Sequence, residues 1–344
     1  MNIKNFFIFF LYFIFLFTSL VSCSSEDGFV VCRTSEYDCD YQYRIPGILT
    51  VTKGSGRRHY ILTEAGMRRA FIKEGEPVAY NPETETVVVK EETDSSVEVF
   101  TVNAENGKQL MQQIFLKPLK IGEGKGGLLS NPVLLSGCVQ NDGTLNLLVS
   151  YEKIGVTSLE VVSDNYYVLY TYEKGNAKKV KKYIFPHEKE TEGQESRYFS
   201  EEPKHIQCTG GNLYLFSEKN YEKDSLYTDK YYLHSNWYLY RADFGSNGKE
   251  AELVPLALIA YDNIWLNYYS EKEKVVYTLT PFVEEGRAVF RITDLNEGYE
   301  LPEEPVEKEN GDFLFSETTD GKPLLFFVKT RSGLEEQRIE LLPL

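Results

Sequence analysis

Short apolar segments, each bounded by turn residues, recur along the chain after residue 28, and no long stripe of helical spacing separates them. This pattern predicts strands joined by hairpins. The predicted strands span residues 44–51, 59–63, 86–90, 97–102, 145–151, 166–172, 212–217, 237–241, 275–280, 288–293 and 324–328. The 25 Tyr and 21 Phe against 3 Met also favour strands, because aromatic rings suit a pleated, half-buried surface. We therefore expect an all-β chain.

Three of the predicted turns share one frame. Each ends a strand and places an acid two residues before a glycine; the acids are Glu105, Glu173 and Asp243, roughly 70 residues apart, and a looser turn follows near Asp294. In such a hairpin the acid can cap backbone N–H groups while glycine takes the positive φ of a tight turn. The roughly 320 residues of the mature chain would make six units of about 50 residues. This predicts a six-bladed β-propeller, with a two-sheet sandwich as the alternative.

The first residues have the features of an export signal. Lys4 precedes an almost unbroken apolar run that ends in small residues before Cys23. The run is about 16 residues long, whereas a membrane-spanning helix, the alternative, needs about 20. The sequence Leu20-Val21-Ser22-Cys23 also looks like a bacterial lipobox, in which Cys23 would be lipidated, although an ordinary cleavage region remains open. We predict a signal peptide over residues 1–23, a propeller over 28–344, and a secreted or cell-surface protein.

Four cysteines remain after the leader: Cys32, Cys39, Cys138 and Cys208. An even number in an exported chain permits two disulfides in any of three pairings, and Cys32 with Cys39 is the local choice. Free thiols are the alternative, because a chain this large does not need disulfides to fold. None of these cysteines has the spacing of a metal site.

Charge and motifs exclude several classes of function. Lys and Arg number 37 against 52 Asp and Glu, a formal net charge of −15, so binding to nucleic acid is disfavoured. The chain has 4 His and contains neither Gly-x-Ser-x-Gly nor His-Glu-x-x-His, so nothing indicates a serine hydrolase or a zinc hydrolase. We predict no cofactor and no metal. Membrane contact is expected only through the N-terminal anchor.

The stretch Tyr43-Arg44-Ile45-Pro46 resembles the opening motif of the sialidase and trans-sialidase superfamily. The recurring turns resemble that family's Asp boxes, although none keeps the usual Ser or Trp. Stretches beginning at residues 130, 200 and 276 match later blades of trans-sialidases in order and spacing. The resemblance covers residues 28–344 and implies a propeller of sialidase type.

Members of this family hold a carboxylate sugar with three arginines from separate blades, because planar guanidinium groups match a carboxylate. They cleave it with a Tyr nucleophile paired to a Glu and with an Asp acid/base. Arg44 fits the first arginine, and a strand arginine paired with a local acid is its alternative reading. Arg68 or Arg69 would fit the first blade only after a two-residue shift.

Other positions depart from the family pattern. Asn131 stands where the resemblance places the Asp acid/base, and Gln207, which follows the Glu202-Pro203 motif, stands where it places a Glu. No arginine occurs in the expected cluster before Arg241. No Tyr follows residue 299, so the last blade lacks the nucleophile.

We therefore predict a catalytically degenerate propeller that binds sialylated or other surface glycans, or a host or cell-surface protein. Its candidate ligand-binding residues are Arg44, Arg68, Arg69, Glu202 and Arg241. The alternative is an active exo-sialidase or trans-sialidase with a displaced site. Tyrosine clusters near residues 166–172 and 231–240 would either stack on sugars or fill the packing between blades.

Overall fold

The computed structural model describes most of the chain after the leader. The described residues are 29–33, 39–53, 55–93, 96–120, 128–156, 161–174, 176–178, 180–185, 199–223, 232–244, 251–260, 266–282, 287–294, 306–309, 311–329 and 336–342. Within these ranges every regular element is a β-strand and none is a helix. This part of the chain contains no helix that is long and apolar enough to cross a membrane. The predicted signal peptide and Cys23 lie outside the described residues.

The described strands form six antiparallel sheets, numbered here along the chain. The first contains β2 (Cys39–Ile45), β3 (Ile48–Lys53), β4 (Gly56–Thr63) and β5 (Gly66–Ala70). The second contains β6 (Glu76–Asn81), β7 (Thr86–Thr93), β8 (Ser96–Asn103) and β9 (Gln109–Leu116). The third contains β10 (Leu119–Lys120), β11 (Leu128–Val139), β12 (Leu145–Val156), β13 (Val161–Tyr172) and β14 (Val180–Ile184).

The remaining three sheets continue this order. The fourth contains β15 (Phe199–Thr209), β16 (Asn212–Lys223), β17 (Tyr232–Phe244) and β18 (Ala251–Ala260). The fifth contains β19 (Leu266–Ser270), β20 (Val275–Phe282), β21 (Arg287–Asp294) and β22 (Val306–Glu309). The sixth contains β23 (Gly311–Glu317), β24 (Pro323–Lys329), β25 (Glu336–Leu342) and the N-terminal strand β1 (Phe29–Arg33).

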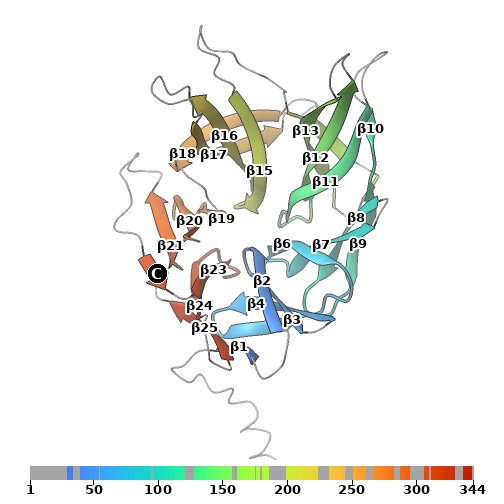
Figure 1. Cartoon of the computed structure of the whole chain (residues 1–344). Helices are drawn as coiled ribbons and strands as arrows, with labels where there is room; N and C mark the ends of the chain where they lie inside the picture. Colours follow the sequence, from blue (N-terminus) through green and yellow to red (C-terminus); the bar gives the residue numbers. More distant parts are fainter. Residues whose placement is uncertain are drawn as a thin grey trace, which may run out of the picture.

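These sheets are arranged around a common centre as a β-propeller (Figure 1). Strands β2, β6, β11, β15, β19 and β23 lie nearest to the centre in Figure 1. The buried apolar clusters fill the spaces between neighbouring sheets; Leu213 and Leu215 of the fourth sheet, for example, pack with Leu148 and Leu169 of the third. The first strand, β1, pairs with β25, so the two ends of the chain meet in one sheet. The predicted all-β fold and its propeller arrangement are confirmed.

Interior strands are apolar on both faces because a neighbouring sheet covers each face. Three consecutive residues of β7, Val87, Val88 and Val89, have no exposed surface. The strands nearest the centre differ from the interior strands in containing proline. Pro77 lies in β6 and Pro203 in β15, and each is beside a shift in the pairing register. Proline is tolerated there because it cannot donate to a ladder and is found on edge strands or at bulges.

The predicted strand 44–51 is wrong, because a turn divides it. Strand β2 ends at Ile45, β3 begins at Ile48, and these two residues pair across the turn. Gly47 has φ of 83°, the conformation that a Pro-Gly turn requires at its second central residue. The Gly47 N–H donates to the carbonyl of Phe315 at 2.8 Å, which ties this turn to the sixth sheet.

The three framed turns lie at equivalent places, between β8 and β9, β13 and β14, and β17 and β18. Each falls between the last two strands of its sheet, as does the segment after β21, although residues 175, 245–250 and 295–305 lie outside the described residues. In the first of these turns, between β8 and β9, the acid Glu105 does not cap the backbone N–H groups. Asn103 Oδ1 accepts from the N–H groups of Glu105 and Asn106, both at 3.2 Å, and the Glu105 carboxylate instead lies 3.8 Å from Arg68.

A disulfide joins Cys138 of β11 to Cys208 of β15 and so links the third and fourth sheets. Of the three possible pairings, this bond leaves only the one in which Cys32 pairs with Cys39. Both of those residues lie in described strands, β1 and β2, but their side chains lie outside the described residues.

Candidate functional site

The predicted site was centred on Arg44, which lies in β2, one of the strands nearest the centre (Figure 1). It lies two residues before Pro46 of the Pro46-Gly47 turn. The Arg44 side chain is outside the described residues. The geometry of the site therefore rests on the other predicted residues and on the positions that depart from the family pattern.

Arg68 and Arg69 are adjacent in β5 and point to opposite faces of the sheet. The Arg68 guanidinium lies 2.5 Å from the Glu85 carboxylate, which also accepts from the Tyr80 hydroxyl at 3.1 Å. Burial by itself would lower the pKa of Arg68, but the hydrogen bond and charge of Glu85 outweigh it and raise that pKa. Burial, followed by the charge of Glu85, raises the pKa of Tyr80. Arg68 is therefore part of an ion pair between the first and second sheets.

Glu202 belongs to a cluster of four side chains, named here the Lys204 cluster. The Lys204 ammonium lies 2.5 Å from Glu202 and 3.0 Å from Glu218. Tyr167 of the neighbouring sheet also bonds Glu202, and burial, followed by the charge of Glu202, raises the pKa of Tyr167 to about 12. Glu202 is therefore committed to a network that links the third and fourth sheets.

Arg241 is likewise paired. Its Nε and NH2 groups donate to the two carboxylate oxygens of Asp243 at 3.1 and 2.9 Å. That hydrogen bond and the charge of Asp243 raise the pKa of Arg241. Both side chains are exposed, so the pair contributes little to stability. The structure therefore does not bring Arg68, Glu202 and Arg241 together as one constellation, because each is bound to its own local partner.

Gln207 has a structural function that sequence reasoning missed. Its Nε2 donates to the carbonyl of Tyr269 at 2.8 Å, and its Oε1 accepts from the N–H of the same residue at 2.9 Å. Gln207 is in β15 and Tyr269 in β19, so this side chain joins the fourth and fifth sheets. A glutamate could not replace it, because an ionised carboxylate has no hydrogen to donate.

Asn131 also uses the chemistry of an amide. It has φ of 49°, a left-handed conformation that asparagine tolerates better than most residues. Its Nδ2 donates to Glu152 at 2.7 Å. An aspartate at this position would face the carboxylate of Glu152 and repel it. The amide of Asn131 is therefore matched to the carboxylate of its neighbour Glu152.

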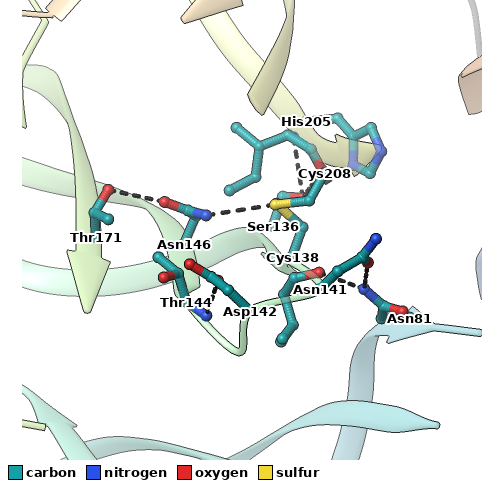
Figure 2. Close-up of a disulfide and its surroundings, with 12 residues drawn as sticks. Asn81, Ser136, Cys138, Asn141, Asp142, Thr144, Asn146, Thr171, His205 and Cys208 are labelled. Atoms are coloured by element: carbon teal, nitrogen blue, oxygen red, sulfur yellow. Dashed lines mark hydrogen bonds between the residues drawn. A yellow bond between two sulfur atoms is a disulfide. The ribbon is translucent and has the colours of Figure 1, made fainter. Parts of the chain in front are cut away.

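A second joint between sheets lies beside the disulfide (Figure 2). Ser136 Oγ lies 2.9 Å from His205 Nδ1 and accepts from the N–H of Ile206 at 3.2 Å. Burial lowers the pKa of His205 to about 4, so the ring is neutral at pH 7. Ser136 is only 4% exposed, so its hydroxyl is enclosed between the two sheets. Nothing in the sequence marks this pair, because its members are distant along the chain.

The described residues contain no group of three or more His, Cys, Asp or Glu side chains placed to hold a metal ion. A pair of acids does occur where β23 ends. Burial, followed by the charge of Glu83, raises the pKa of Glu317 to about 7. Two carboxyl groups in one place do not make a site without further ligands.

The sequence matches no protein-family model and no curated protein. Solved structures with a similar arrangement include hydrazine synthase of Kuenenia stuttgartiensis, 12% identical with a TM-score of 0.41, covering 88% of this chain and 84% of that one. An oligogalacturonate lyase in complex with manganese is 9% identical with a TM-score of 0.39, covering 86% and 85%. The extracellular region of plexin A4 is 9% identical with a TM-score of 0.41, covering 92% and 51%. These scores are too low to carry a conclusion about function.

Proposed function

We propose that this protein is an exported six-bladed propeller of sialidase type that has lost catalysis and acts at the cell surface by binding a glycan or a protein. One observation carries the proposal. The side chains at the positions of catalytic groups make contacts that hold the fold: Gln207 joins two sheets, Asn131 pairs with Glu152, and Arg68 pairs with Glu85. Groups held in this way cannot converge on a substrate.

The blade count follows if each of the six sheets is one blade. The β1–β25 pairing supports it, because ring closure by the two chain ends stabilises a propeller. Residues of β3 and β4 pack with those of β23 and β24 in one apolar cluster, so the first and last sheets are neighbours.

Several Tyr–Glu couples could be mistaken for a nucleophile and its base. They are Tyr80–Glu85, Tyr167–Glu202 and Tyr277–Glu273. Burial is the largest cause of a raised Tyr pKa in each couple. A raised pKa keeps the hydroxyl protonated, which opposes its use as a nucleophile. Their setting therefore supports a protein that does not cleave.

The experiment is turnover of a fluorogenic sialoside at high protein concentration. We expect no release above the buffer rate. The Tyr80→Phe variant is the control, because it removes the hydroxyl of the couple that an arginine contacts. Release by the wild-type protein that Tyr80→Phe abolishes would overturn the proposal and make this chain an enzyme.

A further inference from the structure

The innermost strands of the first four sheets share a bulge. In each of them the pairing register shifts at a point where the innermost strand has one residue more than its neighbour. The extra residue is Val78 in β6, Leu135 in β11 and Lys204 in β15, and it lies within 43–44 in β2. A bulge re-aims a side chain, and bulges are frequent beside binding sites. This repeated feature therefore points to the centre of the propeller as a ligand-binding region.

In β11 the bulge exposes an apolar side chain. Leu135 is 39% exposed, whereas Leu134 and Ser136 on either side of it are buried. Leu134 packs against the second sheet and Ser136 bonds Ile206 of the fourth, so both faces of β11 are covered. The open side of this strand is the one that faces the centre (Figure 1). Val133, two residues earlier, is 48% exposed. We call Val133 and Leu135 the apolar wall.

The apolar wall lies beside the Lys204 cluster. The disulfide joins Cys138 of β11 to Cys208 of β15, and the two strands end at residues 139 and 209. Each residue of β11 is thus level with the residue of β15 that lies 70 positions later. This offset sets residues 133–135 level with 203–205, so the apolar wall and the Lys204 cluster share one stretch of the centre.

The Lys204 cluster carries more negative than positive charge. The carboxylates of Glu202 and Glu218 share the ammonium of Lys204, at 2.5 and 3.0 Å, and Tyr167 contributes a neutral hydroxyl. Two acids against one ammonium leave one negative charge unbalanced within the cluster. An ionised carboxylate accepts up to about four hydrogen bonds, so it can hold a second cation beside Lys204.

We infer that this part of the centre binds a basic side chain of a protein partner, with its aliphatic stem against Val133 and Leu135 and its charged end beside Glu202. Lysine and arginine join a long apolar stem to a cation, which matches an apolar wall next to an acid. This inference rests on the proposed function and selects a protein over a glycan as the ligand of the centre.

The chemistry of the site disfavours other ligands. Sugar rings stack on flat aromatic side chains, whereas Val133 and Leu135 are branched and aliphatic. An anion that approached Lys204 would also meet the two carboxylates that hold it. The net charge of −15 attracts a basic partner to the whole chain and repels an acidic one.

The test is titration of the full mature chain with three capped peptides, Leu-Lys-Leu, Leu-Gln-Leu and Leu-Glu-Leu, followed by NMR of the valine and leucine methyl groups. We expect saturable shifts of the Val133 and Leu135 methyl signals with the lysine peptide. The glutamine peptide should bind about fivefold more weakly because it lacks the charge, and the glutamate peptide should not bind.

Matched variants separate the two parts of the site. Leu135→Ser should weaken binding of the lysine peptide about threefold or more, whereas Leu256→Ser in the outer strand β18, where the leucine is also 39% exposed, should bind like the wild type. Glu202→Gln should weaken binding about fivefold, and Glu252→Gln, which removes an exposed acid from β18, should not. Lys204→Gln should strengthen binding, because it leaves two acids without their ammonium. Misfolding cannot produce such a gain.

Several results would overturn the inference. They are no binding of the lysine peptide, equal binding of the three peptides, equal effects of Leu135→Ser and Leu256→Ser, and no gain of affinity in Lys204→Gln. None of them touches the proposed loss of catalysis, which turnover of the fluorogenic sialoside decides separately. Turnover of that sialoside would remove the proposed function, whatever the peptides do.

Discussion

At the scale of single residues, Gln207 shows how a departure from a catalytic pattern can be a structural requirement. Its donor and its acceptor both bind the backbone of Tyr269 in the neighbouring sheet. Gln207 is 7% exposed, so water cannot replace either bond. Only a side-chain amide offers a donor and an acceptor in this arrangement.

We predict that Gln207→Glu lowers the free energy of unfolding by about 2–4 kcal/mol at pH 7, because it buries a charge and leaves the Tyr269 carbonyl without a donor. Urea denaturation followed by fluorescence measures this change. The exposed Gln113 in β9 provides the control, since Gln113→Glu should change stability by less than about 0.5 kcal/mol. Equal stability of the two variants would contradict the structural function of the Gln207 amide.

The site residues show why sequence could propose candidates but not their partners. Arg68 pairs with Glu85 in the next sheet, and Lys204 collects acids from two strands. The Arg68 pairing depends on how two sheets pack, and the Lys204 pairings depend on the register of β15 with β16. No local sequence pattern encodes either. Strand alternation alone predicts that Arg68 and Arg69 face opposite ways, and this much was within reach of the sequence.

At the scale of elements, sequence patterns identified the interior strands of the sheets. They missed the strands at the two edges of the sheets. Predicted segments coincide with β7, β12 and β20, where burial on both faces produces an unbroken apolar run. The strands β6, β11 and β15 were not predicted as such, because proline and register shifts interrupt their alternation. The outer strands are short or half exposed, so their apolar signal is weak.

The turn at Gly47 gives a prediction at this scale. A Cβ at Gly47 would lie 2.9 Å from the Tyr80 ring, whereas a Cβ at Gly211 meets nothing within 4 Å. Both residues have positive φ, 83° and 78°. We therefore expect Gly47→Ala to lower the free energy of unfolding by about 2–4 kcal/mol, the sum of backbone strain and overpacking.

Gly211→Ala is the matched control, since it carries the backbone strain without the steric contact. Its expected cost is about 1–2 kcal/mol. Chemical denaturation of both variants compares the two costs directly. If Gly211→Ala proved as damaging as Gly47→Ala, the contact between the Pro46-Gly47 turn and Tyr80 would not be a determinant of stability.

At the scale of the whole molecule, neighbouring sheets are joined by more than apolar packing. The disulfide links β11 with β15, Ser136 bonds His205 and Ile206 beside it, and Gln207 continues to the fifth sheet. These joints all lie on strands nearest the centre (Figure 1). The recurring turns at equivalent places in the second to fifth sheets reflect the same repeating plan, which sequence spacing had already indicated.

The disulfide permits a test of how much the covalent link and the hydrogen bonds between sheets each contribute to the free energy of unfolding. Its cysteines are 70 residues apart, and a loop of that length adds about 4 kcal/mol in the chain-entropy account. We expect the Cys138→Ala/Cys208→Ala variant to lose about 2–5 kcal/mol of unfolding free energy. It should keep its circular dichroism spectrum, because Ser136 and His205 still join the third and fourth sheets. Urea titration without reductant measures the loss. A midpoint equal to that of the wild type would mean that the noncovalent joints alone hold the third and fourth sheets together.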